Sequence, residues 1–289
     1  MEGKKRSAGS KQQIEQLVHL SELPSTYRCE IEKGVSTGWS SLDKFLQGIR
    51  YGEMTVITAD TGVGKTTFAI NLCLNACRQG IGVAINSWEM KPQIVQRKIA
   101  SIVLKKPLKL APFTDEDNIL FDEWMSLHNI YINPSTSCTS IEKIEAQMIV
   151  AKQNGVQVAV FDHLDYLVNM RREKIHEAIE ETVKALHEIC FRLDMHFLLI
   201  CHPKQTGYEK EEIGIHSLKG SSSIKQYADN IIVLHRCSRT DSQACESKVK
   251  VKVVKNRMFG TEGVTYLYYQ KDWDGYLQLK DYSASTEEK

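Results

Sequence analysis

The sequence contains no apolar run that approaches the roughly 18–20 residues of a membrane-spanning helix, so we expect no membrane partner. Internal repeats and low-complexity tracts are also missing. The eight cysteines include no C-x-x-C pair, and only Cys73 and Cys77 lie one helical turn apart. We therefore expect reduced thiols in a reducing compartment rather than a cysteine metal site.

The chain also lacks an excess of charge of either sign. Its net charge is +1 at pH 7, so the overall charge does not predict a nucleic-acid partner. Any nucleic-acid site must instead come from local clusters of lysine and arginine. With 42% apolar and 25% charged residues, the composition is typical of a soluble globular protein.

The 289 residues are enough for one large domain or two small ones, and we divide them into three zones. Residues 1–33 are expected to form a polar tail and a short amphipathic helix at 12–23. The apolar face of that helix must pack on its own domain or on a neighbouring subunit. Residues 34–280 form the main domain, and residues 281–289 form a polar C-terminal tail. The opening residues are followed by no apolar segment, so we expect no secretory signal.

Apolar, β-branched runs alternate with helix-like periods through most of the main domain. This order predicts an α/β fold with a central, mostly parallel sheet flanked by helices, and antiparallel strands at the C-terminal edge. A short helix through Leu46 should end at Gly48, and Thr139 with Glu142 forms a capping-box pattern. Residues 105–117 form a polar, proline-containing segment. Strands are expected at 55–58, 83–86, 129–132, 156–161, 197–201, 231–234, 248–254, 263–270 and 276–279, and longer helices at 91–104, 139–154 and 174–193.

The first strand of the main domain ends in a glycine-containing loop, and an apolar helix-like run follows at once. Strand, glycine loop and helix are the context that a phosphate-binding P-loop requires, the alternative being a strand–turn–helix that contains Gly-Lys-Thr by chance. Lys65 can then reach the β- and γ-phosphates of a nucleotide, and the Thr66 hydroxyl can ligate Mg²⁺. Ala59 replaces the first glycine of the motif G-x-x-x-x-G-K-[ST], which is tolerable if φ stays negative there. The nucleotide-binding residues expected from this loop are Ala59, Asp60, Thr61, Gly62, Val63, Gly64, Lys65, Thr66 and Thr67.

Chemically suggestive side chains follow three further strands. In open α/β sheets ligands bind at the carboxyl ends of the strands, so these residues are candidates for the site. Glu89 could orient or activate an attacking water, or could be an ordinary acid that precedes a helix. Asp162 ends an apolar run in the Walker B manner and is expected to hold Mg²⁺. His202 could sense the γ-phosphate, or could form a turn before Pro203.

Basic residues gather at three places outside the loop. A segment at 203–225 that contains glycine and serine would suit the backbone of single-stranded DNA, and so would a basic pair just past Asp162, although both could be solvated loops. Lys255 and Arg257 end a late strand and are either a surface pair or an arginine finger for a neighbouring subunit's nucleotide. The DNA-binding residues expected from the first two places are Arg171, Arg172, Lys204, Lys210, Lys219, Ser221 and Ser222.

The ordered set of motifs resembles the ATPase domain of DnaB-type replicative DNA helicases, and it is most similar to phage primase-helicases and Twinkle-type mitochondrial helicases. The resemblance implies a RecA-like P-loop NTPase fold. It implies that Lys65, Thr66 and Asp162 bind Mg-NTP and that Glu89 activates water. The matching stretches are 52–58, 62–68, 87–90, 160–167, 200–204, 218–231 and 254–260.

Five further residues receive roles from the same resemblance. His202 occupies the position of a nucleotide-state sensor. Lys255 and Arg257 match a basic pair that is offered to the nucleotide of the adjacent subunit. Arg236 and Tyr269 fall near positions that contact the base.

The resemblance implies partners and cofactors as well. The 204–223 loop corresponds to a central-channel loop that grips single-stranded DNA, and the 12–23 helix to a linker that docks on the adjacent subunit. The expected assembly is therefore a homo-oligomeric ring, a hexamer, that uses Mg²⁺ with ATP or dTTP and works with a primase or polymerase of a replisome. We expect no primase and no helical N-terminal domain before these motifs, which leaves ring assembly, loading and primase coupling open. The expected location is the cytoplasm or nucleoid, with an organellar matrix or a phage-infected cell as alternatives.

Two other functions stay open at this point. A RecA-family recombinase or mediator would bind single strands as an open filament without unwinding. A nucleotide-gated adaptor would hydrolyse NTP weakly and serve a larger replisome. A small-molecule kinase fits least, because no acceptor-binding lid or substrate motif is present.

Overall fold

The structure is a computed structural model that describes residues 19–20, 33–108, 112–135, 140–168, 175–203, 221–236, 248–269 and 278–281. The chain divides into two compact units, Met1–Glu32 and Lys33–Lys289. Most of the segment at 12–23, where we expected an amphipathic helix, lies outside the described residues. The second unit contains all the features that follow.

The second unit is built on a nine-stranded sheet with the order β3-β2-β4-β5-β1-β6-β7-β8-β9. The strands from β3 to β6 in this order run parallel, and β7, β8 and β9 are antiparallel at one edge. This arrangement confirms the α/β fold with antiparallel strands at the C-terminal edge. The strands are β1 (Met54–Ala59), β2 (Gly82–Ser87), β3 (Ile130–Ile132), β4 (Val156–Asp162), β5 (His196–Cys201), β6 (Asn230–Arg236), β7 (Lys248–Asn256), β8 (Gly263–Tyr269) and β9 (Leu279–Asp281).

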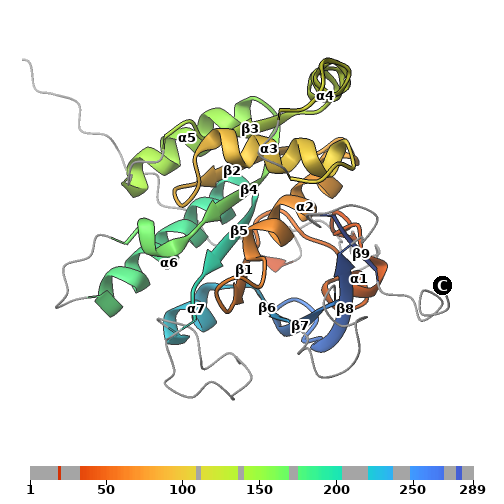
Figure 1. The fold of residues 1–289 in the computed structure, drawn as a ribbon. Coiled ribbons are helices and arrows are strands. Elements are labelled where there is room, and N and C mark those ends of the chain that lie inside the picture. The colour runs from red at the N-terminus through yellow and green to blue at the C-terminus, as the bar shows by residue number, and fades with distance from the viewer. Residues whose placement is uncertain are drawn as a thin grey trace, which may run out of the picture. The chain divides into compact units, whose positions relative to one another are not determined.

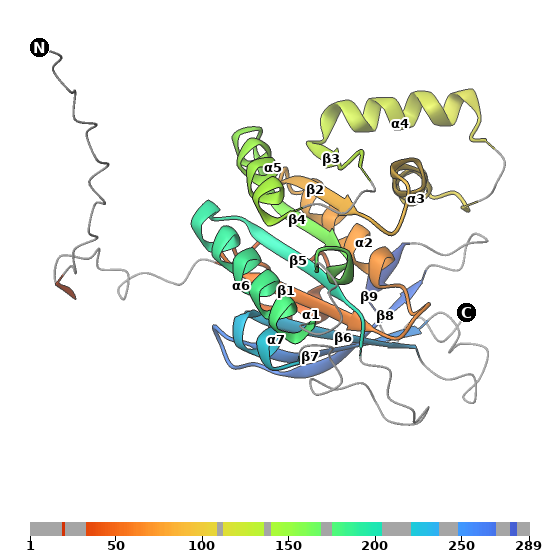
Figure 2. The same ribbon diagram turned by 90° about the vertical axis from the view of Figure 1, so that its left-hand side faces the viewer.

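Helices cover both faces of the sheet (Figures 1 and 2). One face packs against α1 (Ser40–Leu46), α2 (Lys65–Cys77) and α3 (Pro92–Val103). The other face packs against α5 (Ile141–Gln153), α6 (Ile175–Leu193), α7 (Ser221–Tyr227) and the short 3₁₀ helix η3 (Leu164–Tyr166). None of the helices in the described part of the chain has both the length and the apolar character needed to cross a membrane.

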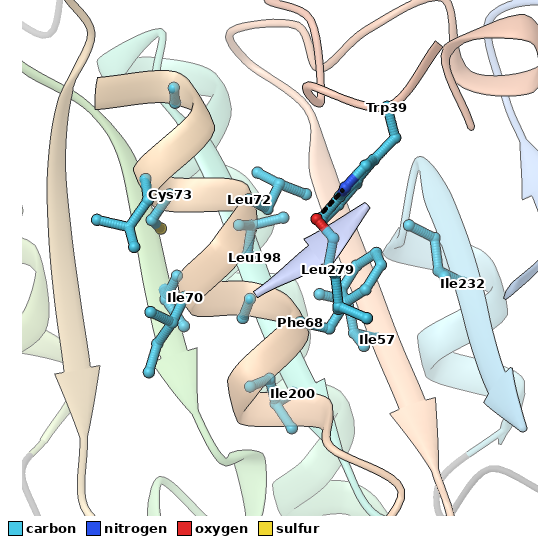
Figure 3. Packing of buried hydrophobic residues seen from close by; sticks show 14 of the residues in the cluster. Trp39, Ile57, Phe68, Ile70, Leu72, Cys73, Leu198, Ile200, Ile232 and Leu279 are labelled. Atoms are coloured by element: carbon cyan, nitrogen blue, oxygen red, sulfur yellow. Dashed lines mark hydrogen bonds between the residues drawn. The ribbon is translucent and has the colours of Figure 1, made fainter. Parts of the chain in front are cut away.

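The two apolar layers explain why the central strands are continuous apolar runs. Side chains alternate between the faces of a strand, so Val56 of β1 enters one core while Ile57 enters the other. In the core around α2, Trp39 stacks on Phe68 with ring centroids 5.0 Å apart (Figure 3). The Trp39 indole N–H donates to the carbonyl of Leu279 at 3.0 Å, and this bond joins the residue that precedes α1 to β9.

The structure corrects several local expectations. Part of the segment at 105–117 and the residues after it form α4 (Asp115–Leu127), a helix that we did not predict. Its capping box joins Thr114 and Asp117, whereas α5 starts after Ser140 without a side-chain cap. The last strand in the described residues lies at 279–281, and the first half of the expected strand at 276–279 lies outside those residues. Asp281 accepts hydrogen bonds from the Ser40 and Ser41 backbone amides at the start of α1.

His196 is a buried histidine at the start of β5 that should make folding stability depend on pH. Its Nδ1 lies 2.7 Å from the Arg50 carbonyl, and its Nε2 has no hydrogen-bond partner within the described ranges. Burial lowers its pKa to about 4, so the folded protein holds it neutral. An unfolded chain with a histidine pKa of about 6.5 binds the proton first, so stability should fall as pH drops from 6.5 towards 4.

We expect this one residue to cost about 3 kcal/mol of unfolding free energy across that pH range, from its shift of roughly two and a half pKa units. Urea unfolding at several pH values measures the slope. His196→Leu should flatten the slope, whereas the matched change His128→Leu on α4's C-terminal side should leave it unchanged. Equal slopes in the wild type and His196→Leu would contradict the prediction.

Candidate nucleotide-binding and hydrolysis site

The loop after β1 has the backbone that phosphate binding needs. Gly62 and Gly64 have φ angles of 80° and 106°, which L side chains rarely adopt, and α2 begins directly at Lys65. Ala59 is the last residue of β1 and has no positive φ, so alanine is suitable where the motif usually has glycine. The first amides of α2 therefore point at the space in front of the loop, where an anion is favoured.

The Lys65 side chain folds back onto the residues at the start of this loop. Its ammonium donates to the carbonyls of Ala59 at 2.9 Å and Asp60 at 3.2 Å. Burial lowers its pKa, while the nearby carboxylates of Glu89 and Asp162 act in the opposite direction. The ammonium is thus held on backbone carbonyls beside the loop that would carry the phosphates.

Asp162 and Thr66 come together from β4 and α2. The Thr66 hydroxyl donates to Asp162 Oδ2 at 2.9 Å, and the Ser87 hydroxyl lies 3.4 Å from the same oxygen. Asp162 Oδ1 is buried and has no hydrogen-bond partner among the described residues. Burial raises the pKa of this carboxyl to about 6. A buried carboxylate oxygen without a donor, beside a hydroxyl, fits an oxygen-ligated Mg²⁺.

Glu89 and His202 lie at the same edge of the sheet, as their positions after β2 and β5 predicted. They flank His163, a residue that the sequence analysis did not single out. The His163 ring centroid is 4.3 Å from that of His202, and His163 Nε2 is 4.0 Å from Glu89 Oε2. The only signal for His163 in the sequence is its position directly after Asp162.

A small cavity lies between the P-loop and the strands β6, β7 and β8. It has a volume of about 210 Å³, and Tyr269 and Arg236 line it, which brings both predicted base-contact residues next to the loop. Burial raises the pKa of the Tyr269 phenol to about 12. Lys248 also lines the cavity. The sequence did not indicate this residue, because its distance from the P-loop depends on the pairing of β6 with β7. The remaining lining residues are Gly62, Val63, Gly64, Thr67 and Val249.

Gly64 is the loop position where a side chain should be least tolerated. A Cβ there would lie 2.3 Å from the Tyr269 hydroxyl, whereas a Cβ at Gly62 would meet no atom within 4 Å. Both glycines have positive φ, so Gly62→Ala carries the backbone strain of about 1–3 kcal/mol without the collision. We expect Gly64→Ala to lower the melting temperature and the nucleotide affinity more than its matched control Gly62→Ala. Thermal unfolding and nucleotide titration measure both effects. Equal effects would contradict the prediction and show that the Tyr269 side chain moves away from the added Cβ at little cost.

Lys255 and Arg257 lie near the amino ends of the parallel strands, whereas the P-loop lies at their carboxyl ends. The Lys255 ammonium donates to the Ala228 carbonyl at 2.7 Å, and the Arg257 guanidinium pairs with Asp229 at 2.9 Å. Asp229 precedes β6 and its backbone amide bonds to Met54, the first residue of β1. A strand of six residues spans roughly 20 Å, so neither cation can reach the P-loop of its own chain.

The expected DNA contacts fall mostly outside the described residues. Arg171, Arg172, Lys204, Lys210 and Lys219 all lie there. Ser221 and Ser222 open α7, so these positions belong to a helix rather than to the flexible loop that we expected. Of these, only the Ser222 side chain is described, and it is exposed.

The mostly parallel sheet and the loop after β1 define a RecA-like P-loop domain. Residues 34–277 match the model of the DnaB-like helicase C terminal domain. The chain belongs to this family.

Relatives and solved structures agree with this assignment. The chain is 27% identical over 259 residues to the replicative DNA helicase DnaB of Buchnera aphidicola subsp. Acyrthosiphon pisum, covering 83% of this chain and 55% of that protein. It is 25% identical to the replicative DNA helicase DnaC of Bacillus subtilis, covering 86% and 57%. The chain thus spans about half the length of the curated relatives it matches.

The fold is similar to that of solved structures. One, described as a DnaB-like replicative helicase and its interactions with primase, has a TM-score of 0.77 at 21% identity, covering 86% of this chain and 62% of that one. Another, described as an ATPase domain, has a TM-score of 0.76 at 21% identity, covering 86% and 92%. Both likenesses support the RecA-like fold.

Proposed function

We propose that this chain is the motor domain of an NTP-hydrolysing, ring-forming DNA helicase or translocase that acts on single-stranded DNA in replication. The observation that carries the proposal is the 2.9 Å hydrogen bond between Thr66 and Asp162, with Glu89 and Lys65 beside them. These side chains come from different elements and meet in front of one phosphate-binding loop. Such a convergence is what Mg-NTP hydrolysis requires.

Each residue has a role in that reaction. Lys65 moves from the loop carbonyls to the β- and γ-phosphates, and the loop amides hold the phosphate oxygens. Thr66 and Asp162 would hold Mg²⁺, which neutralises charge on the transferred phosphoryl group. Glu89 accepts a proton from the attacking water, and His202 is placed to respond to the γ-phosphate. Tyr269 and Arg236 line the side of the loop where the nucleoside would lie.

Hydrolysis would be completed by a second copy of the chain. Arg257 and Lys255 lie at the end of the sheet opposite the P-loop, so any nucleotide that they contact belongs to a neighbour. A guanidinium supplied in trans stabilises the charge of the transition state. We therefore infer a homo-oligomeric ring, with a hexamer as the expected number, that uses ATP or dTTP.

The surroundings of such a motor follow from its relatives. The names of two relatives describe replicative DNA helicases, and one similar structure includes interactions with primase. We propose the same setting here: single-stranded DNA in the channel, a primase or polymerase as partner, and a place in the cytoplasm or nucleoid. The residues from 34 to 280 would act as one motor domain, with the segments on either side as linker and tail.

The test is hydrolysis of ATP and dTTP with and without single-stranded DNA, across protein concentration, for the wild type and Lys65→Ala. We expect a rate that rises with both DNA and concentration, and a Lys65→Ala variant that is inactive but folded. Forked-DNA unwinding then separates a helicase from a strand-pairing recombinase. A slow hydrolysis rate that single-stranded DNA does not change would favour a nucleotide-gated adaptor and contradict the proposal.

A further inference from the structure

We propose that Glu89, His163 and His202 form a binding site for a transition-metal cation of the Zn²⁺ class, separate from the Mg²⁺ site expected at Thr66 and Asp162. One ligand atom from each of the three side chains lies within 4.8 Å of the others. Two imidazoles and a carboxylate are a donor set of catalytic zinc sites, which leave a fourth position open. Mg²⁺ prefers oxygen ligands, so this donor set selects a softer cation.

The distances allow the three ligands to close on one ion. Zinc lies about 2.0–2.2 Å from its nitrogen and oxygen ligands, which places tetrahedral ligand atoms about 3.4 Å apart. His163 Nε2 and Glu89 Oε2 are 4.0 Å apart, and all three ligand atoms lie within 4.8 Å of one another, so the side chains must approach by at most about 1.4 Å to reach that spacing. The Glu89 side chain is 49% exposed and free to make that approach, whereas the His163 side chain is only 11% exposed and keeps its place.

A carboxylate lies beside the second ring nitrogen of His163. This Nδ1 is buried, makes no hydrogen bond to the described residues, and lies 3.5 Å from Asp165 Oδ2. A histidine ligand commonly gives its second ring nitrogen to a carboxylate, which fixes the tautomer and leaves the first nitrogen for the metal. Here that first nitrogen is Nε2, the atom that faces Glu89. Asp165 lies on η3, two residues after His163, so a small approach of its carboxylate would let it accept a hydrogen bond from Nδ1 when a metal binds Nε2.

The charges around the cluster favour a dication. Glu89, Asp165 and Asp162 are the nearby carboxylates, and Lys65 and Lys98 are the ammonium groups that oppose them. Lys65 donates to two loop carbonyls, which spread its charge over the backbone. Three carboxylates thus face two ammonium groups around the cluster.

An ion at this site would hold the carboxylate that hydrolysis needs. We therefore expect Zn²⁺ to inhibit NTP hydrolysis in the presence of Mg²⁺. This consequence rests on the proposed function, whereas metal binding itself does not.

The binding test uses the full chain without nucleotide, with Zn²⁺ titrated against a chromophoric chelator. We expect the wild type to bind one equivalent more than His163→Asn or His202→Asn, whose folds are checked by thermal unfolding. Asp165→Asn keeps all three ligands and should weaken that equivalent about ten- to hundred-fold. His128→Asn is the matched control and should bind as the wild type does. All variants keep the same cysteines, so any Zn²⁺ bound by cysteine contributes equally to every titration. Equal binding by every variant would overturn the proposal.

The inhibition test repeats the titration during hydrolysis at saturating Mg-NTP. We expect the wild type to lose activity at the Zn²⁺ concentration that fills the site, and Asp165→Asn to need about ten- to hundred-fold more. Inhibition of both proteins at one concentration would overturn the inhibitory role. A wild type that hydrolyses nothing would contradict the proposed function, while the chelator titration would still decide whether the metal site exists.

Discussion

Arg257→Ala should lower the DNA-stimulated rate of NTP hydrolysis by about 10³-fold or more, the effect of losing an arginine finger. The physical reason is placement. Arg257 follows β7 at the amino end of the parallel strands, and the P-loop lies at their carboxyl end. The guanidinium cannot reach its own nucleotide, so in the proposed ring its loss would remove transition-state stabilisation from a neighbour. Nucleotide binding by the variant should be nearly unchanged.

Mixing two inactive variants makes this prediction specific. Lys65→Ala keeps Arg257, and Arg257→Ala keeps an intact P-loop, so a mixed assembly contains some complete sites. We expect the mixture to recover part of the activity that neither variant has alone. No recovery at any ratio, or full activity of Arg257→Ala by itself, would contradict a site shared between subunits.

A structural effect of Arg257 must be separated from a catalytic one. Its guanidinium pairs with Asp229 and donates to the carbonyls of Gln226 and Ala228 at the end of α7. Asp229→Asn is the matched control, because it removes the ion pair and keeps the arginine. Asp229 Oδ2 also accepts the Met54 backbone amide at 2.8 Å and lies 3.2 Å from His187 Nε2, so two other neighbours remain. We expect Asp229→Asn to lose far less activity than Arg257→Ala; equal losses would assign the effect to the docking of α7.

The strands and the P-loop could be predicted because their signals are local. A strand that is buried on both faces must be apolar along its length, and the glycines with positive φ have few substitutes. Strand order is not local. Ser87 pairs with Asp162 in the register of β2 and β4, and this pairing brings Glu89 and His163 together. The contacts of His163 with Glu89 and His202 depend on this strand order, so the sequence alone offered no reason to group the three residues.

The missed helix α4 has a different cause. Its only buried residues are Asp117 and Phe121, and several of its apolar side chains, including Ile119, Leu120 and Leu127, are exposed. The stripe that packs on the core is short, Phe121, Trp124 and Met125, and the exposed apolar residues obscure the period by which helices are recognised in a sequence. Its start is instead set by the capping box of Thr114 and Asp117 and by the ion pair between Lys106 and Asp117 at 2.6 Å. The pattern of Thr114 and Asp117 is a capping-box signal that the sequence offers, whereas the ion pair with Lys106 is visible only in the folded chain.

Glu89→Gln should lower NTP hydrolysis by about 10²- to 10⁴-fold and leave nucleotide binding intact, because glutamine keeps the shape of the side chain but cannot accept a proton from water. The alternative role, an acid that stabilises a helix N-terminus, fits the structure poorly. The helix α3 begins at Pro92 after the N-cap Lys91, and no acidic residue lies in its first turn. Glu89 instead lies beside Lys65, Asp162 and His163.

The control for this variant is Asp162→Asn, which alters the expected Mg²⁺ ligand and should weaken Mg-dependent nucleotide binding as well as hydrolysis. Titration with a fluorescent nucleotide and single-turnover hydrolysis separate the two defects. Binding without hydrolysis in Glu89→Gln would assign proton acceptance to Glu89, since the loop, the lysine and the Mg²⁺ ligands are all intact. Wild-type hydrolysis by Glu89→Gln would instead require a different group to orient the water. His202 and His163 are the other side chains within reach of that place, because both lie with Glu89 in one cluster whose ligand atoms are within 4.8 Å of one another.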